Sequence, residues 1–148
     1  MSNRLRGLSG LRIDHYVRVG DEHFGPAPLE QLVDWVNENL PKNAVMAGPM
    51  PTMANLLLST GRPIVNHPHY EDVGIRERTK KVYTVFSRKS KDEVHSSLVG
   101  LKVQYLVLHA GWCLTTERGG CALTEVWDAE EPDLKAEGRE PVCPGLWH

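Results

Sequence analysis

The sequence lacks any hydrophobic run long enough to span a lipid bilayer. No stretch of its 148 residues approaches the roughly 18 consecutive apolar residues of a transmembrane helix. The first 24 residues contain arginines but no continuous apolar core, so they indicate neither a signal peptide nor a transit peptide. The chain as written is therefore expected to be soluble and to carry no targeting signal.

Several familiar chemical motifs are also missing. There is no CxxC pair, no Gly-x-Gly-x-x-Gly after a strand, no serine in a nucleophile elbow and no Asn-X-Ser/Thr acceptor. A zinc ribbon, a dinucleotide fold and a serine hydrolase are therefore not indicated, and no cofactor is predicted. The net charge of −2 gives no field that would favour nucleic acid or an anionic membrane.

The middle of the chain alternates between helical and strand-like patterns. Apolar residues recur at helical spacing in four segments, and three short apolar segments are typical of buried strands. The strand over 103–109 is apolar on both faces, as in a parallel sheet. The predicted helices span 28–40, 52–59, 73–88 and 91–101, and the predicted strands 43–48, 62–65 and 103–109. This order predicts an α/β fold with a small, open, mainly parallel sheet and helices on its faces.

Local signals support the boundaries of these elements. Pro28 suits a first helical turn, and Gly61 stands where a helix C-cap is expected. Ser90 and Glu93 match the capping box, which predicts a helix from Lys91.

The two ends of the chain have weaker patterns. We expect residues 1–27 to form a flank that is poorly ordered or only loosely strand-like, and 28–128 to form the α/β domain. Within that domain, 123–127 is a possible edge strand. Residues 129–148 are acidic and contain prolines, and we expect an irregular tail there.

Charge is divided along the sequence. Residues 73–102 carry a charge of +5 and residues 125–140 a charge of −5. Two solvated helix faces explain this division most simply. The alternative is a pair of basic helices beside an anion such as a phosphate.

The three cysteines leave their pairing open. Cys113 and Cys121 flank a Gly-Gly turn, so two strands meeting there could bring them to bridging distance. Free, half-buried thiols are the alternative that the spacing allows.

The most unusual segment is Asn66-His-Pro-His-Tyr-Glu-Asp72, between a predicted strand and a predicted helix. His67 and His69 are two residues apart, which places both rings on the same side of an extended chain. Three hypotheses compete: a divalent metal site, a polar site for a substrate or leaving group beyond a strand end, and a structural bend in which Asp72 caps the next helix. A metal-dependent hydrolase would require the first.

Several blocks of the sequence resemble the dumpy-nineteen family of protein C-mannosyltransferases. The blocks are Asn43 to Val73, which contains RPIVNHPHYED, then IRERTKKVYTVFSRKSKDEV, Trp112-Cys113, Gly120-Cys121 and Glu125-Val-Trp-Asp128. The resemblance runs from about Pro28 to about Cys143. Residues 1–26 and the ending Pro144-GLWH do not resemble the family.

The resemblance implies a function and a location. Members of the family are multi-spanning enzymes of the endoplasmic reticulum membrane with GT-C architecture, and their C-terminal part is a soluble α/β domain in the lumen. They transfer mannose from dolichyl phosphate mannose to tryptophan in Trp-x-x-Trp sequences of secretory polypeptides. The catalytic carboxylate and the donor-binding transmembrane helices lie outside this chain. The isolated chain is therefore expected to be an inactive fragment or a non-catalytic interaction module.

The resemblance also implies roles for particular residues. A rim of the domain that faces the membrane would carry His67, His69, Tyr70, Glu71 and Arg76 as contacts for the acceptor or the donor phosphate. An oxidising lumen would suit a Cys113–Cys121 disulfide. No bound metal is expected.

Overall fold

The computed structural model describes residues 15–19, 28–66 and 73–147, with three strands and a larger set of helices. The strands are β1 (His15–Val19), β2 (Met46–Ala47) and β3 (Tyr105–His109). The first helices are α1 (Pro28–Asn39), α2 (Met50–Thr60), α3 (Val73–Tyr83), the 3-10 helix η2 (Thr84–Phe86) and α4 (Lys91–Gly100). The later helices are α5 (Ala110–Cys113), α6 (Leu123–Glu130), α7 (Pro132–Ala136) and α8 (Val142–Trp147).

The sheet is open and parallel, as the sequence predicts. Its strand order is β1-β3-β2, and β3 pairs in parallel with both neighbours. The register places Val19 beside His109 and Ala47 beside Leu106. The predicted strand over 62–65 is reduced to a single parallel bridge between Met46 and Ile64. β3 thus lies at the centre of the sheet, although it comes last in the sequence.

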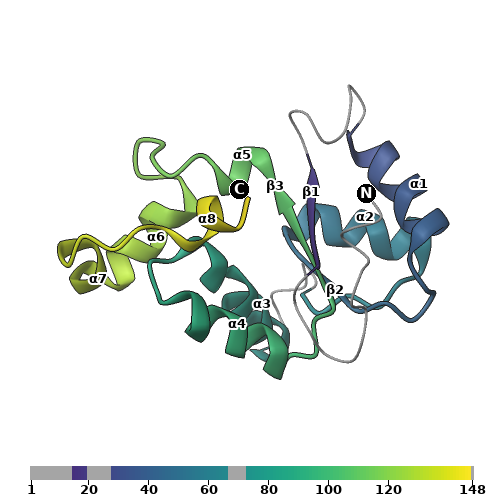
Figure 1. Cartoon of the computed structure of the whole chain (residues 1–148), viewed down its shortest axis with the longest axis horizontal. Helices are drawn as coiled ribbons and strands as arrows, with labels where there is room; N and C mark the ends of the chain where they lie inside the picture. The colour runs from purple at the N-terminus through teal and green to yellow at the C-terminus, as the bar shows by residue number, and fades with distance from the viewer. Residues whose placement is uncertain (1–14, 20–27, 67–72, 148) are drawn as a thin grey trace.

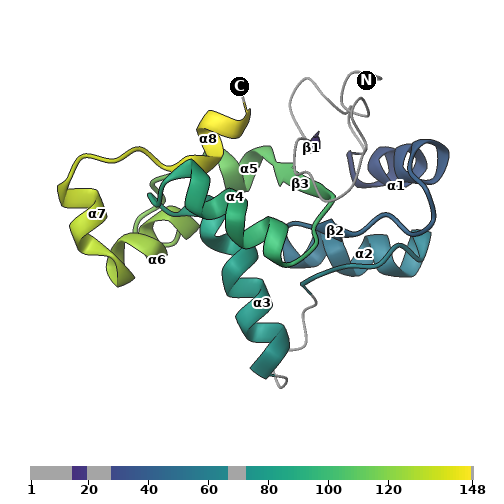
Figure 2. The same ribbon diagram turned by 60° about the horizontal axis from the view of Figure 1, so that its bottom comes forward.

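Helices cover both faces of the sheet, so the fold has three layers (Figure 1). Alternate residues of β3 point to opposite sides because the side-chain period of a strand is two. Tyr105 and Val107 pack against the core beneath α1 and α2. Leu106 and Leu108 pack against the core formed with α3, α4, α5 and α8. Figure 2 shows the same division from a second direction, with α1 and α2 on one side of the strands and the later helices on the other.

Arg62 joins the ends of the two helices on the first face. It follows Gly61, which ends α2 in the left-handed conformation with a φ of 67°. The guanidinium group is buried and donates hydrogen bonds to the carbonyl oxygens of Leu40 at 2.7 Å and Thr60 at 3.0 Å. It also donates to the carbonyls of Val36 and Pro41 and to the side chain of Asn37. One cation therefore joins the ends of α1 and α2 and supplies a donor to the carbonyls of Leu40 and Thr60. The carbonyls of Val36 and Pro41 also accept backbone amides.

The second face begins with a helix that is shorter than predicted. α3 ends at Tyr83 and continues as the 3-10 turn η2, whose residues Val85 and Phe86 are buried. Ser90 then caps α4 as predicted, because its Oγ accepts the amide of Glu93 at 3.1 Å. The glutamate carboxylate lies 3.1 Å from the serine hydroxyl.

We expect Ser90→Ala to lower the free energy of unfolding by about 1 kcal/mol. The substitution leaves an amide in the first turn of α4 without its acceptor. Urea denaturation of the full chain measures the change. Ser96→Ala, a substitution in the same helix away from the cap, is the matched control, and an equal effect of both variants would contradict a capping role.

The two ends of the chain are more regular than predicted. His15–Val19 forms the strand β1 inside the flank that we expected to be poorly ordered or only loosely strand-like. The predicted edge strand over 123–127 is wrong, because this segment lies in the helix α6. The predicted irregular tail contains α7 and α8, and α8 buries Val142, Leu146 and Trp147. The proposed boundaries at 27 and 128 remain predictions.

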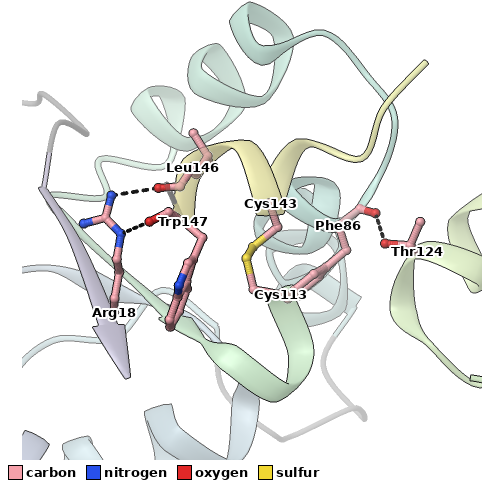
Figure 3. The surroundings of a disulfide bond; sticks show 7 residues. All are labelled: Arg18, Phe86, Cys113, Thr124, Cys143, Leu146 and Trp147. Atoms are coloured by element: carbon pink, nitrogen blue, oxygen red, sulfur yellow. Dashed lines mark hydrogen bonds between the residues drawn. A yellow bond between two sulfur atoms is a disulfide. The ribbon is translucent and has the colours of Figure 1, made fainter. Parts of the chain in front are cut away.

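The disulfide joins a different pair from the one predicted. Cys113 bonds to Cys143, as Figure 3 shows. Cys121 is a free, exposed thiol. The expected pairing needed two strands meeting at the Gly-Gly turn, whereas Cys113 ends the helix α5 and Cys121 precedes the helix α6. Helix α8 packs on α5 and places Cys143 within bonding distance of Cys113.

The loop that carries Cys121 is held by Glu125. The carboxylate of Glu125 accepts the backbone amides of Arg118, Gly120 and Ala122. The bond from Arg118, followed by those from Ala122 and Gly120, lowers the pKa of Glu125 despite some desolvation. These contacts fix the loop as part of the α6 N-terminus rather than as a hairpin.

Arg18 connects the first strand to the last helix. Its side chain donates to the carbonyls of Leu146 at 2.8 Å and Trp147 at 2.6 Å, as Figure 3 shows. These residues are 128 and 129 positions away in the sequence. The two ends of the described chain therefore belong to one folded unit.

The basic and acidic segments lie against each other rather than forming two separate solvated faces. Arg88 pairs with Asp128 at 2.8 Å, and both side chains are largely buried. Two further ion pairs join Lys80 to Glu130 at 3.3 Å and Lys89 to Glu131 at 2.5 Å. Both lysine ammonium groups also lie over the ring of Trp127, at 5.9 and 5.7 Å from its centroid. Three of the eight cations in residues 73–102 thus attach α6 and the residue after it to α3 and to the turn that follows η2.

Candidate functional site at the carboxyl edge of the sheet

The carboxyl ends of all three strands meet at one edge of the sheet. β1 ends at Val19, β2 at Ala47 and β3 at His109, and the strands run in parallel. Ligands of open α/β sheets bind outside this edge. The segment that the sequence singles out begins there, because Asn66 follows the bridge residue Ile64.

Asn66 fixes the start of this segment against β2. Its side chain is fully buried, and its Oδ1 accepts the amide of Gly48 at 3.3 Å. Its Nδ2 donates to the carbonyl of Gly48 at 2.5 Å. A side-chain amide can match one backbone residue in this way because it carries both a donor and an acceptor. The paired contacts hold the chain at position 66 beside the end of β2.

Gly48 is the partner that makes this close packing possible. A Cβ atom at this position would lie 3.0 Å from both the Cβ and the carbonyl oxygen of Val107. We expect Gly48→Ala to destabilise the fold by about 1–3 kcal/mol, because the backbone oxygen of a central strand has no room to move. Thermal denaturation measures the change.

Gly100→Ala is the matched control for this prediction. A Cβ atom at Gly100 would meet no atom within 4 Å, and its helical position favours alanine. A Gly48→Ala variant as stable as the Gly100→Ala variant would contradict the close approach of Gly48 to β3.

Most of the predicted site lies outside the described residues. This applies to His67, His69, Tyr70 and Glu71, and also to Asp72, the predicted helix cap. Their roles therefore remain predictions, as does the metal-dependent hydrolase that the histidines would require. The residues on either side of them, Asn66 and Val73, are described.

Arg76 is the predicted site residue that the structure does place. It is exposed on α3 and lines a hollow of about 190 Å³ between α3 and α6. Tyr83 and Trp127 contribute aromatic walls, and Lys80 and Glu130 contribute charged side chains at this hollow. A cation beside aromatic walls can hold an anionic or an aromatic group. The contact between Arg76 and a substrate remains a prediction.

The sequence reasoning missed His109 at the same edge. It occupies the last position of β3, beside Val19, and lines a crevice of about 120 Å³ together with residues of α1 and α2. The available signal was a polar residue at the end of an otherwise apolar parallel strand.

The described part of the chain contains neither a cluster of metal ligands nor a membrane-spanning helix. Within residues 15–19, 28–66 and 73–147, no group of three or more His, Cys, Asp or Glu side chains is arranged to hold a metal ion. In the same ranges, no helix has both the length and the apolar character needed to cross a bilayer.

Comparison with known proteins extends the resemblance noted above. The Dpy19 family model, described as Q-cell neuroblast polarisation, matches residues 14–147. The match includes β1 and the end of α8, so the resemblance is longer at both ends than the sequence blocks suggested. The contacts of Arg18 with α8 give this extent a structural reason.

Curated relatives have names that agree with this family. The human protein C-mannosyl-transferase DPY19L1 is 48% identical over 120 residues, covering 81% of this chain and 18% of that protein. The C-mannosyltransferase dpy-19 of Caenorhabditis elegans is 46% identical over 143 residues, covering 96% of this chain and 20% of that protein. The human probable C-mannosyltransferase DPY19L2 is 44% identical over 139 residues, covering 94% and 18% respectively.

The chain spans between 16% and 20% of the length of these and other similar relatives. The match nevertheless covers nearly all of the described strands and helices. The chain therefore belongs to the Dpy19 family.

Proposed function

We propose that this chain is the luminal α/β domain of a protein C-mannosyltransferase of the endoplasmic reticulum. The observation that carries the proposal is that Asn66, which precedes the His-Pro-His-Tyr-Glu segment, is held at the carboxyl edge of the sheet, in a chain whose relatives are named C-mannosyltransferases. The Cys113–Cys143 disulfide is in keeping with an oxidising compartment. The GT-C architecture of the complete protein is part of the same proposal.

The proposed reaction transfers mannose from dolichyl phosphate mannose to tryptophan in a Trp-x-x-Trp sequence. The bond between the anomeric carbon and the phosphate oxygen breaks, and a bond forms to C2 of the indole. A carboxylate outside this chain takes the proton from C2, and the dolichyl phosphate leaves with its charge. Hydrogen-bond donors near the departing phosphate would stabilise that charge.

Residues of this chain are proposed to assist at the leaving group and the acceptor. His67, His69 and Tyr70 can donate hydrogen bonds to phosphate oxygens, and Arg76 can supply a positive charge on the neighbouring helix α3. Glu71 can accept a hydrogen bond from the acceptor polypeptide. Asp72 would then cap α3, which follows it directly.

Peptide binding to this chain tests the proposal. We expect a blocked Trp-x-x-Trp peptide to shift the amide signals of residues 66–76 in an ¹⁵N spectrum, and a Leu-x-x-Leu peptide to shift them much less. With dolichyl phosphate mannose present, the isolated chain should still transfer no mannose, because the proposed base lies elsewhere. Shifts confined to other surfaces, or none at all, would contradict the proposal.

A non-catalytic interaction module is the second candidate function. The apolar hollow beside Arg76 favours it, since Leu123, Val126 and Trp127 give that hollow a mainly apolar wall. Binding that does not depend on the tryptophans of the peptide, with shifts on α3 and α6, would support this candidate over the first.

A further inference from the structure

The crevice beside His109 lies where two neighbouring parallel strands continue into helices on opposite faces of the sheet. From the carboxyl end of β1 the chain continues to α1, on one face of the sheet. From the carboxyl end of β3 it continues to α5, on the opposite face. Adjacent parallel strands whose connections leave to opposite faces form a crevice in which open α/β folds bind ligands. The hollow of about 120 Å³ lies at this point of the fold.

The walls of the crevice are mostly apolar. Val19 ends β1, and α1 contributes Leu29 and Leu32. The first turns of α2 add Pro51 and the two polar residues Thr52 and Asn55. Among the described residues that line the crevice, none carries a formal charge with histidine neutral. Such a wall does not compensate the desolvation of an ion, so it favours an uncharged ligand.

His109 supplies a directed hydrogen-bonding group. Its side chain points to the same face as Val107, toward α1 and α2, because residues two apart share a strand face. Nδ1 is buried and has no hydrogen-bond partner among the residues that the structure describes. The ring is half-buried and lines the crevice. Because Nδ1 is enclosed, Nε2 is the ring nitrogen that is left to meet a ligand there.

The environment of Nδ1 assigns the tautomer of this ring. A proton on Nδ1 would be a buried donor without an acceptor, which is unfavourable. The neutral ring therefore carries its proton on Nε2 and presents an N–H donor to the crevice. A ligand that accepts this hydrogen bond must have an oxygen or another acceptor atom beside its apolar body.

We propose that this crevice binds a compact, uncharged ring that bears a hydroxyl group, with the oxygen on Nε2 of His109. The volume admits one small ring rather than a drug-sized molecule. Apolar walls contact the body of the ring, and the hydroxyl of Thr52 can accept its proton. A phenol, as in a tyrosine side chain, and a sugar ring share this chemistry. The proposal goes beyond mannosyl transfer and does not depend on it.

Four probes added to the ¹⁵N-labelled chain test the proposal. Phenol and methyl mannopyranoside represent the two sources of a hydroxyl-bearing ring, toluene lacks the hydroxyl, and inorganic phosphate is a charged acceptor. We expect phenol or the mannoside to shift the signals of Val19, Thr52 and His109, with a dissociation constant on the order of millimolar. Which of the two binds more tightly identifies the source. Toluene should bind about tenfold more weakly than phenol.

Two substitutions separate the hydrogen bond from the shape of the crevice. His109→Leu should weaken binding about tenfold, while His109→Gln, which keeps an N–H donor, should stay within about threefold of the original. His95→Leu, on α4 at the other face, is the matched control and should change nothing. If His109→Leu fails to fold, the comparison of phenol with toluene on the unaltered chain shows whether the hydroxyl group contributes to binding.

Three results would overturn the proposal. The first is that neither hydroxyl-bearing probe shifts the crevice signals. The second is that phenol and toluene bind equally well. The third is that phosphate binds more tightly than both rings, which would assign the crevice to an anion.

Discussion

Replacing Arg62 by alanine is expected to lower the free energy of unfolding by about 3–5 kcal/mol, a large part of the stability of a domain of this size. The side chain is 4% exposed and donates to four carbonyl oxygens and to Asn37. Without the guanidinium group, the carbonyls of Leu40 and Thr60 lose their side-chain donor, whereas those of Val36 and Pro41 keep a backbone amide. Buried acceptors without partners are more costly than the average hydrogen bond is stabilising.

Chemical denaturation of the full chain at neutral pH measures this effect. Arg78→Ala is the matched control, because Arg78 is exposed and its side chain donates to the carbonyl of Val65 at 3.3 Å. Its loss should change stability by less than about 1 kcal/mol. The free energy of unfolding of Arg62→Lys should lie between those of Arg62→Ala and Arg78→Ala, since lysine keeps the charge but lacks the several donors of a guanidinium group. Equal stability of Arg62→Ala and Arg78→Ala would show that Arg62 does not join the two helices.

Removal of the Cys113–Cys143 disulfide is the second change with a large expected effect. The bond closes a loop between residues 30 positions apart, and the chain-entropy relation gives about 3–4 kcal/mol for a loop of this length. Cys143→Ser should lower stability by this amount, because the covalent link between α8 and α5 is lost. Packing, the bonds from Arg18 in β1 and the bond from the amide of Val142 to the carbonyl of Ser87 still hold α8. Denaturation with and without a reducing agent measures the loss.

The cysteine that the sequence favoured as the partner provides the control. Cys121→Ser should change stability by no more than about 0.5 kcal/mol, because its thiol is exposed and unpaired. A reducing agent should destabilise the Cys121→Ser variant as much as the original chain, and the Cys143→Ser variant not at all. A large loss of stability in Cys121→Ser would instead support the Cys113–Cys121 disulfide that the sequence suggested.

The centre of the fold could be predicted because its signals are local. The helices α1, α2 and α4 follow a 3.6-residue apolar period, and Ser90 and Gly61 mark their boundaries chemically. β3 could be recognised as a buried parallel strand because residues on both of its faces are apolar. The alternation of these elements was enough to indicate a parallel sheet covered by helices.

The ends of the chain were harder because their structure depends on distant contacts. The segment 123–127 is too short for its period to separate a strand from a helix, and the contacts of Glu125 with the preceding loop decide the outcome. α8 contains Pro144 and Gly145, which argue against a helix locally, yet its packing and its disulfide hold it. β1 is extended because it pairs with β3, 90 residues later in the register His15–Tyr105.

Asn66 is the part of the NHPHYED block that the structure describes, and the site proposed for the rest of the block stays a prediction. The NHPHYED block indicated a polar turn after a strand, and Asn66 lies at the carboxyl edge of the sheet as that reading requires. The burial of Arg62 has no signature in the sequence, and the signal for His109 was only a polar residue at the end of an apolar strand. The surroundings of both residues depend on elements that are distant in the chain, namely α1 for Arg62 and β1 for His109.

Mannose transfer by a full-length Dpy19 protein that contains this segment is the most direct test of the proposed role. The reaction is followed by the hexose mass added to a Trp-x-x-Trp peptide, with dolichyl phosphate mannose as the donor. The double variant His67→Ala/His69→Ala should lose at least about tenfold in transfer, an amount typical of lost stabilisation of a leaving group, while retaining its thermal stability. Transfer at the original rate by a folded double variant would contradict a role of this turn in the reaction.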